Sequence, residues 1–155
     1  MDVSQTIKTN SSEGLIVTDL SDNIANQKYH FYLLDISKNC SIFSNNVISS
    51  FICIEGSASV NGKNISKFKW FHVPPLQKLE FESKNSAKVL LGSTEEIDFS
   101  ISSKKIENKE DLIPLSDYKV EKPWGFENWY TDNLDNPKYA LKRIHMEKDF
   151  QSSLQ

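Results

Sequence analysis

The chain has 155 residues, of which 38% are hydrophobic and 25% are charged, the balance of an ordinary soluble globular protein. It contains 18 lysine and arginine residues and 21 aspartate and glutamate residues, so the net charge is −3 with neutral histidines. Such a chain has no basic field to hold a nucleic-acid backbone or an anionic membrane surface. No apolar run approaches the roughly 20 residues that a bilayer span needs. Composition therefore argues against nucleic-acid and membrane partners.

The sequence carries no sign of export. Residues 1–5 lack the basic and apolar regions of a signal peptide, which predicts a cytoplasmic protein. Cys40 and Cys53 do not form a C-x-x-C pair and are expected to be buried thiols. Arg143 is the only arginine, so a site built from several guanidinium clamps is not expected.

The first two thirds of the chain show a pattern of short β-strands. Side chains alternate from Tyr29 to Leu34, and Phe51–Ile54 is an apolar run typical of a buried central strand. Asn61-Gly62 is the strongest short signal for a hairpin turn. Ile65–Val73 is predicted as the return strand, which ends at Pro74-Pro75 because proline cannot donate to a β-ladder.

Further strands are predicted over residues 79–82, 87–91 and 97–101, where apolar side chains alternate or form a buried run. No segment of ten or more residues in this part has a clean helical period. Many short strands at intervals of about ten residues predict an all-β sandwich or barrel.

The β pattern stops over residues 104–117, which are rich in charged residues and contain Pro114. This segment is predicted as a linker or covering loop, with a weakly signalled helical turn over residues 108–112. A β pattern resumes at Tyr118, and residues 139–146 are predicted as a strand. The predicted organisation is a barrel over 1–103, a linker over 104–117, and additional strands over 118–155.

No motif for phosphate binding or nucleophilic catalysis is present. His30, His72 and His145 are far apart in sequence, and each is expected to be a surface or core residue unless a barrel brings them together. An aromatic cluster over residues 124–130 is interpreted as a hydrophobic strand that covers a barrel, or as a surface for a partner. The alternative interpretation of this cluster is a wall on which a carbohydrate stacks.

Two segments carry a family resemblance. Residues 51–62, followed by Phe71-His72-Val73-Pro74, resemble the central hairpin of a cupin. This resemblance implies a double-stranded β-helix, the jelly-roll barrel of cupins, with extra C-terminal strands.

The second segment is more specific. Glu121–Glu127, then Lys142-Arg143-Ile144, then Ser153-Leu154-Gln155 resemble the entry to the cupin domain of type II mannose-6-phosphate isomerases. The resemblance implies a place in sugar-phosphate metabolism, with residues 118–155 as the opening strands of a second cupin or as a cover for the first. It makes Lys142 and Arg143 candidate ligand-binding residues, and His72 is a third candidate.

The resemblance does not supply a complete metal site. Cupin metal ligands are histidines and a glutamate, and the positions that correspond here to the glutamate and to the first two histidines hold poor ligands for a divalent metal. The corresponding positions are Ser49 for the glutamate, Phe43/Asn45 or Ile42/Ser44 for the first histidines, and Leu79 or Glu80 for the last. In the second segment only Gln155 matches a metal ligand. Zinc or another divalent metal is therefore expected only if a continuation of the chain supplies the remaining ligands.

Three functional hypotheses follow. The first is a non-catalytic cupin that acts as a scaffold or forms a homodimer through its sheet edges. The second is part or a homologue of a metal-dependent sugar-phosphate isomerase, which is not expected to be catalytic as this chain alone. The third is a barrel that binds a small ligand without a metal, such as a sugar, a sugar phosphate or a sugar nucleotide.

Overall fold

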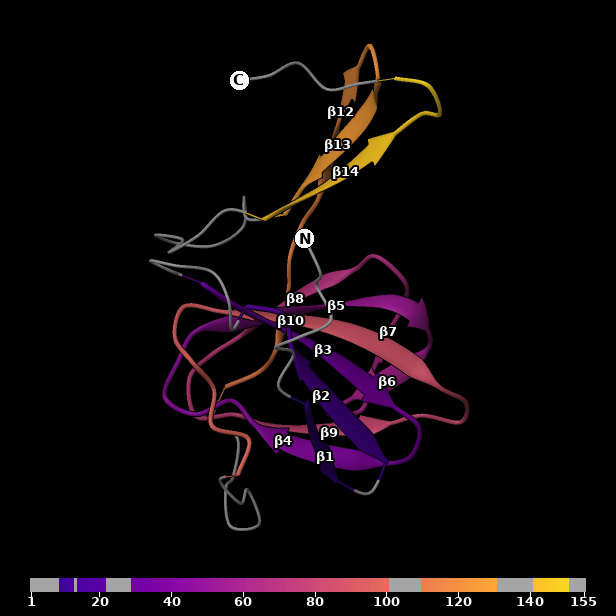
Figure 1. The fold of residues 1–155 in the computed structure, drawn as a ribbon. Coiled ribbons are helices and arrows are strands. Elements are labelled where there is room, and N and C mark those ends of the chain that lie inside the picture. The colour runs from indigo at the N-terminus through magenta and orange to yellow at the C-terminus, as the bar shows by residue number, and fades with distance from the viewer. Residues whose placement is uncertain (1–8, 13, 22–28, 101–109, 131–140, 151–155) are drawn as a thin grey trace. The chain divides into compact units, whose positions relative to one another are not determined.

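The computed structural model describes residues 9–12, 14–21, 29–100, 110–130 and 141–150 (Figure 1). All named elements are β-strands, which confirms the predicted all-β class. Within the described residues no helix is long and apolar enough to cross a membrane. The chain forms two compact units, Met1–Ile113 and Pro114–Gln155, and the division lies inside the segment 104–117.

Six strands of the first unit and β11, which lies at the division, form a seven-stranded sheet in the order β1-β2-β3-β10-β5-β8-β11. Its strands are β1 (Thr9–Ser12), β2 (Leu15–Asp19), β3 (His30–Ile36), β5 (Ser49–Gly56), β8 (Trp70–Val73), β10 (Ala87–Ser93) and β11 (Ile113–Pro114). β5 and β10 lie at its centre and are antiparallel, and Phe51 faces Leu91 across them. The predicted apolar run at residues 51–54 is therefore a central strand.

A four-stranded sheet in the order β4-β9-β6-β7 provides the second layer (Figure 1). Its strands are β4 (Cys40–Phe43), β6 (Ala58–Val60), β7 (Lys63–Ile65) and β9 (Lys78–Glu82). The core lies between the two sheets. At its centre the Phe51 ring stacks on Phe71, with 5.3 Å between centroids, and meets the edge of Phe81 from the other sheet at 6.2 Å. Burial of these large rings contributes several kcal/mol in total, at about 1.5–3 kcal/mol each.

The Asn61-Gly62 turn is confirmed, but the return strand is shorter than predicted. Val60 pairs with Lys63 around the turn, and both turn residues have positive φ, as a type I′ turn requires. Residues 65–73 do not form one strand, because the chain leaves β7 and enters the other sheet as β8. Phe68 lies at this crossing. It has a positive φ of 65°, and its N–H donates to the Cys53 carbonyl at 2.8 Å.

Two further expectations are wrong within the described residues. The alternation over 97–101 does not form a strand at residues 97–100, because the Asp98 carboxylate accepts the Ser100 N–H at 2.9 Å and closes a turn. The helical turn expected over 108–112 is absent at residues 110–112, and residues 108–109 lie outside the described part. In both places a local side-chain hydrogen bond or loop path overrides a weak periodicity.

The second unit contains a three-stranded antiparallel sheet. Its strands are β12 (Tyr118–Lys122), β13 (Gly125–Trp129) and β14 (Lys142–Met146), in the order β12-β13-β14. The strand predicted over 139–146 is confirmed from Lys142 onward, and residues 139–140 lie outside the described part. Residues that face each other across the strands share one side of the sheet.

The register therefore defines two faces. The Trp129 face carries Tyr118, Val120, Lys122, Glu127, Trp129, Lys142, Ile144 and Met146. The Phe126 face carries Lys119, Glu121, Phe126, Asn128, Arg143 and His145.

Candidate functional site

Three of the described positions that correspond to cupin metal ligands hold residues in other roles. Ser49 lies on the inner face and is fully buried, and Leu79 is a fully buried core residue. Glu80 is exposed, and its backbone N–H donates to the Asn61 side chain. Among the described residues no group of three His, Cys, Asp or Glu side chains could hold a metal ion. The described residues of the barrel therefore present no cluster that fits a divalent metal, and Gln155 lies outside the described residues.

The barrel does not bring the three histidines together. His30 shares the inner-face row with Ser93 and Ser49, whereas His72 lies opposite Ser50 on the outer face of the same sheet. His145 belongs to the second unit. Burial lowers the pKa of His72, although the charge of Glu110 acts in the opposite direction. Burial therefore favours the neutral form of His72.

The first unit carries a surface groove of about 440 Å³, which we call the β6–β9 groove. The β6–β7 hairpin and the end of β9 build it. Ser59 lies opposite both Asn64 on β7 and Glu82 on β9, so these three side chains project from the same side of the sheet. The residues that line the groove are Ser57, Ala58, Ser59, Asn64, Ile65, Ser66, Glu82, Lys84 and Asn85.

The polar side chains of the β6–β9 groove stand apart from those around it in the described residues. In the described part of the chain none of its seven polar side chains has a hydrogen bond or ion pair to another residue. Polar residues beside the groove behave differently: Asn61 binds the backbone of β9 through both side-chain atoms, and the Ser83 hydroxyl donates to the Ser57 carbonyl. The groove thus offers hydroxyl and amide groups, one carboxylate and one ammonium for hydrogen bonds to a small molecule.

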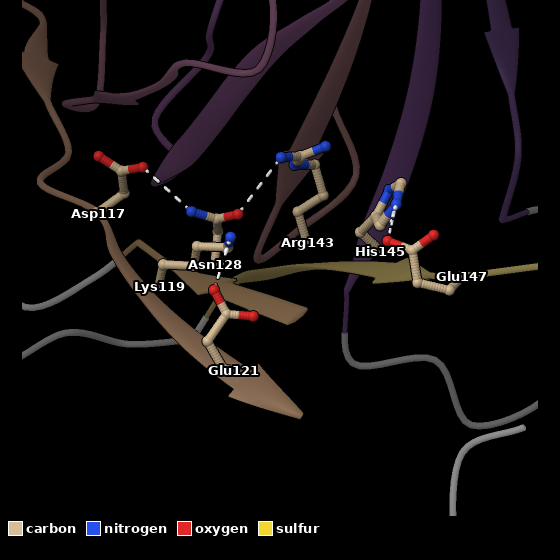
Figure 2. Close-up of polar contacts among 7 residues, drawn as sticks. All are labelled: Asp117, Lys119, Glu121, Asn128, Arg143, His145 and Glu147. Atoms are coloured by element: carbon tan, nitrogen blue, oxygen red, sulfur yellow. Dashed lines mark hydrogen bonds and ion pairs between the residues drawn. The ribbon is translucent and has the colours of Figure 1, made fainter. Parts of the chain in front are cut away.

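A second polar site lies on the Phe126 face of the three-stranded sheet (Figure 2). Asn128 donates to the Asp117 carboxylate and accepts from the Arg143 guanidinium, both at 3.3 Å. The Phe126 ring stacks on His145 with 4.7 Å between centroids, and the Lys119 ammonium lies 4.3 Å from the same ring. These contacts hold each cation of this face against an aromatic ring or an amide.

Carboxylates complete the Phe126 face. Lys119 pairs with Glu121 at 2.7 Å, and His145 lies 3.5 Å from Glu147 (Figure 2). These pairs are exposed, and exposed pairs contribute about 0–1 kcal/mol each. Lys119 and Arg143 lie beside three carboxylates, those of Asp117, Glu121 and Glu147, so this face has no excess of positive charge that would attract an anionic ligand.

The Trp129 face is centred on a buried carboxylate. Glu127 is only 7% exposed, accepts hydrogen bonds from Lys142 at 3.2 Å and from the Trp129 indole at 3.1 Å, and lies 4.0 Å from Lys122. Burial raises the pKa of Glu127, but the hydrogen bond from Lys142 and the charges of Lys142 and Lys122 outweigh it. The pKa therefore lies below its ordinary value.

The two basic candidates from the sequence lie on opposite faces of β14. Lys142 belongs to the Trp129 face and Arg143 to the Phe126 face, because neighbouring residues of a strand alternate in direction. Within this sheet they do not contact one small ligand together. The aromatic cluster is likewise divided: Tyr130 is buried, whereas Trp124, Phe126 and Trp129 are half-buried.

Comparison with known proteins identifies the fold. No protein-family model matches the sequence, and no curated protein sequence is significantly similar to it. Among solved structures, oxalate decarboxylase from Bacillus subtilis at pH 4.6 superimposes on 63% of this chain and 28% of its own, with a TM-score of 0.50 and 13% sequence identity. The chain has a cupin fold. It spans less than a third of the length of that decarboxylase.

A second cupin structure, AerE from Microcystis aeruginosa, is similar over 80% of this chain and 64% of its own, with a TM-score of 0.49 and 10% identity. Identities of this size concern the fold alone. The predicted cupin resemblance is confirmed at that level, and the resemblance to mannose-6-phosphate isomerase finds no support among these structures.

Proposed function

We propose that this cupin is a binding protein of carbohydrate metabolism that holds a small sugar in the β6–β9 groove. The observation that carries the proposal is a groove of about 440 Å³ lined by seven polar side chains without partners in the described residues. Small-molecule sites of proteins have volumes of about 300–1,000 Å³ and use a few placed polar groups for orientation.

The chemistry of the lining favours a sugar. Five of the seven polar side chains are neutral hydroxyl or amide groups, which donate and accept hydrogen bonds as sugar hydroxyls require: Ser57, Ser59, Asn64, Ser66 and Asn85. Glu82 and Lys84 together leave the groove without net charge. A groove on the outside of the barrel also agrees with an interior that is filled by apolar side chains.

The proposal is tested by thermal unfolding in the presence of D-mannose, D-glucose and their 6-phosphates. At a sugar concentration of ten times Kd, binding adds about 1.4 kcal/mol to the free energy of unfolding, which raises the Tm by several degrees. Asn64→Ala and Ser59→Val should each abolish the increase, because they remove groups that line the groove.

The matched control is Ser41→Val. Ser41 is an exposed strand serine on β4, in the same sheet but outside the groove, so this variant should respond to sugar as the wild type does. Valine is well tolerated in strands, so both serine variants should fold. If no sugar raises the Tm, or if the groove variants respond like the control, the proposal is wrong.

A scaffold role is the second candidate. It is favoured by three exposed apolar side chains on the Trp129 face, Tyr118, Ile144 and Met146, which are about half exposed. Exposed apolar side chains in one place mark surfaces that contact other proteins. Light scattering tests this role: a dimer that Ile144→Lys dissociates would support it, and a monomeric wild-type protein would contradict it.

A further inference from the structure

Two opposite charges share the β6–β9 groove without pairing. Glu82 and Lys84 both line it, and neither has an ion pair or hydrogen bond with any described residue. The same spacing of two residues gives close pairs elsewhere in the chain. Lys78 and Glu80, on the same strand as Glu82, lie 2.7 Å apart, as do Lys119 and Glu121. The separation of Glu82 from Lys84 therefore needs a local cause.

The cause is the path of the chain after β9. The strand ends at Glu82, and hydrogen bonds hold Ser83: its N–H donates to the Asn39 side chain at 3.3 Å, and its hydroxyl lies within hydrogen-bond distance of the Ser57 and Asn85 carbonyls. Glu82 consequently stays in the row of Ser59 and Asn64, whereas Lys84 belongs to the following turn. The two charges therefore line one groove from a strand end and from the bend that follows it.

We infer that the ligand of the groove is a sugar that carries both a cationic amine and an anionic group, such as a phosphorylated amino sugar; this inference rests on the proposed function. The Glu82 carboxylate would accept from the amine beside Ser59 and Asn64. The Lys84 ammonium would donate to the anionic group beside Asn85. The neutral hydroxyl and amide groups between them would bind the sugar hydroxyls.

Four related sugars separate the contributions of the two charges. Isothermal titration calorimetry on the full chain compares D-glucose, D-glucosamine, D-glucose 6-phosphate and D-glucosamine 6-phosphate. Each charge should lower Kd by about two- to five-fold, the range for an exposed ion pair, and D-glucosamine 6-phosphate should bind most tightly. The gain should shrink at high salt because the groove is open to solvent.

Charge variants assign each gain to one side chain. Glu82→Gln should remove the gain from the amine and leave the gain from the phosphate. Lys84→Gln should do the reverse. Glu80→Gln, which neutralises an exposed carboxylate of the same strand outside the groove, should change neither.

The outcomes distinguish this inference from the proposed function. The inference is wrong, and the proposed sugar site stands, if D-glucose binds as tightly as the charged sugars. The same holds if Glu82→Gln keeps the gain in affinity from the amine, or if Lys84→Gln keeps the gain from the phosphate. If none of the four sugars binds, both are wrong.

Discussion

Tyr32 shows how one buried residue ties a loop to the barrel. Its side chain is 2% exposed, its phenol oxygen accepts the Ile97 N–H at 2.9 Å, and its ring meets the edge of Phe99 at 4.9 Å. The segment after β10 is thus held without a strand of its own. Burial raises the pKa of Tyr32 to about 12, although the hydrogen bond from Ile97 lowers it.

This pKa predicts a loss of stability in alkali. The phenol is protonated in the folded state up to pH of about 12 and in the unfolded state only up to about 10. Stabilisation by Tyr32 is therefore complete below pH 10 and is lost as the pH rises from about 10 to about 12. We expect the wild type to lose about 1–2 kcal/mol relative to Tyr32→Phe over this range, allowing for solvent screening. Urea unfolding of both proteins at each pH measures it, and parallel pH profiles would contradict it.

At the scale of elements, the turn at Asn61-Gly62 was readable from sequence because only a few residues tolerate positive φ. The sequence does not predict that the chain passes to the other sheet after this turn. The apolar pattern over 65–73 continues smoothly, but Ile65 and Trp70 belong to different sheets. Periodicity reports which side chains are buried and does not report against which sheet they pack.

The same element suggests a stability test. Asn61 accepts the Glu80 N–H at 2.8 Å and donates to the Lys78 carbonyl at 3.0 Å, so its side chain joins the β6–β7 turn to β9. Asn61→Ala should lower the free energy of unfolding by about 1–3 kcal/mol, because it leaves these backbone groups unpaired and strains a positive φ. The measurement is urea unfolding without ligand.

Asn64→Ala is the control for this test. Asn64 lies on the same hairpin, is exposed and has no partner among the described residues. Its replacement should change the free energy of unfolding by no more than about 0.5 kcal/mol. Equal effects of the two substitutions would show that the side chain of Asn61 does not join the turn to β9.

The candidate site was the least predictable part of the molecule. The β6–β9 groove combines residues 57–66 with residues 82–85, and only the strand order β9-β6-β7 brings these segments together. Its serines and asparagines are also common in turns, so sequence alone gave them no special weight. Conversely, Lys142 and Arg143 are neighbours in sequence, and the alternation of β14 separates them.

At the scale of the whole molecule, the two compact units differ in how much apolar surface they bury. The first contains a core shared by two sheets, with β5 and β10 at the centre. Among the described residues of the second unit, the buried hydrophobic side chains are Leu115 and Tyr130. A three-stranded sheet with so few buried apolar groups has a low free energy of local opening.

This difference predicts unequal hydrogen exchange. Amides of β5 and β10 should exchange slowest, and amides of β13, although it is a central strand, should exchange at least about tenfold faster, equivalent to about 1.4 kcal/mol less protection. Exchange monitored by mass spectrometry on the full chain measures both. Equal protection of β13 and β5 would mean that the second unit opens only with the first.

Consecutive residues of β14 lie on opposite faces of the sheet, which matters for the alignment of related sequences. A shift of one residue in the alignment of this strand would assign Lys142, the partner of Glu127, to the place of Arg143, the partner of Asn128. Substitutions on one face of the sheet would then be compared with substitutions on the other face. Related sequences are therefore best aligned here by pairs, so that a change at Glu127 is sought together with one at Lys142, and a change at Asn128 together with one at Arg143.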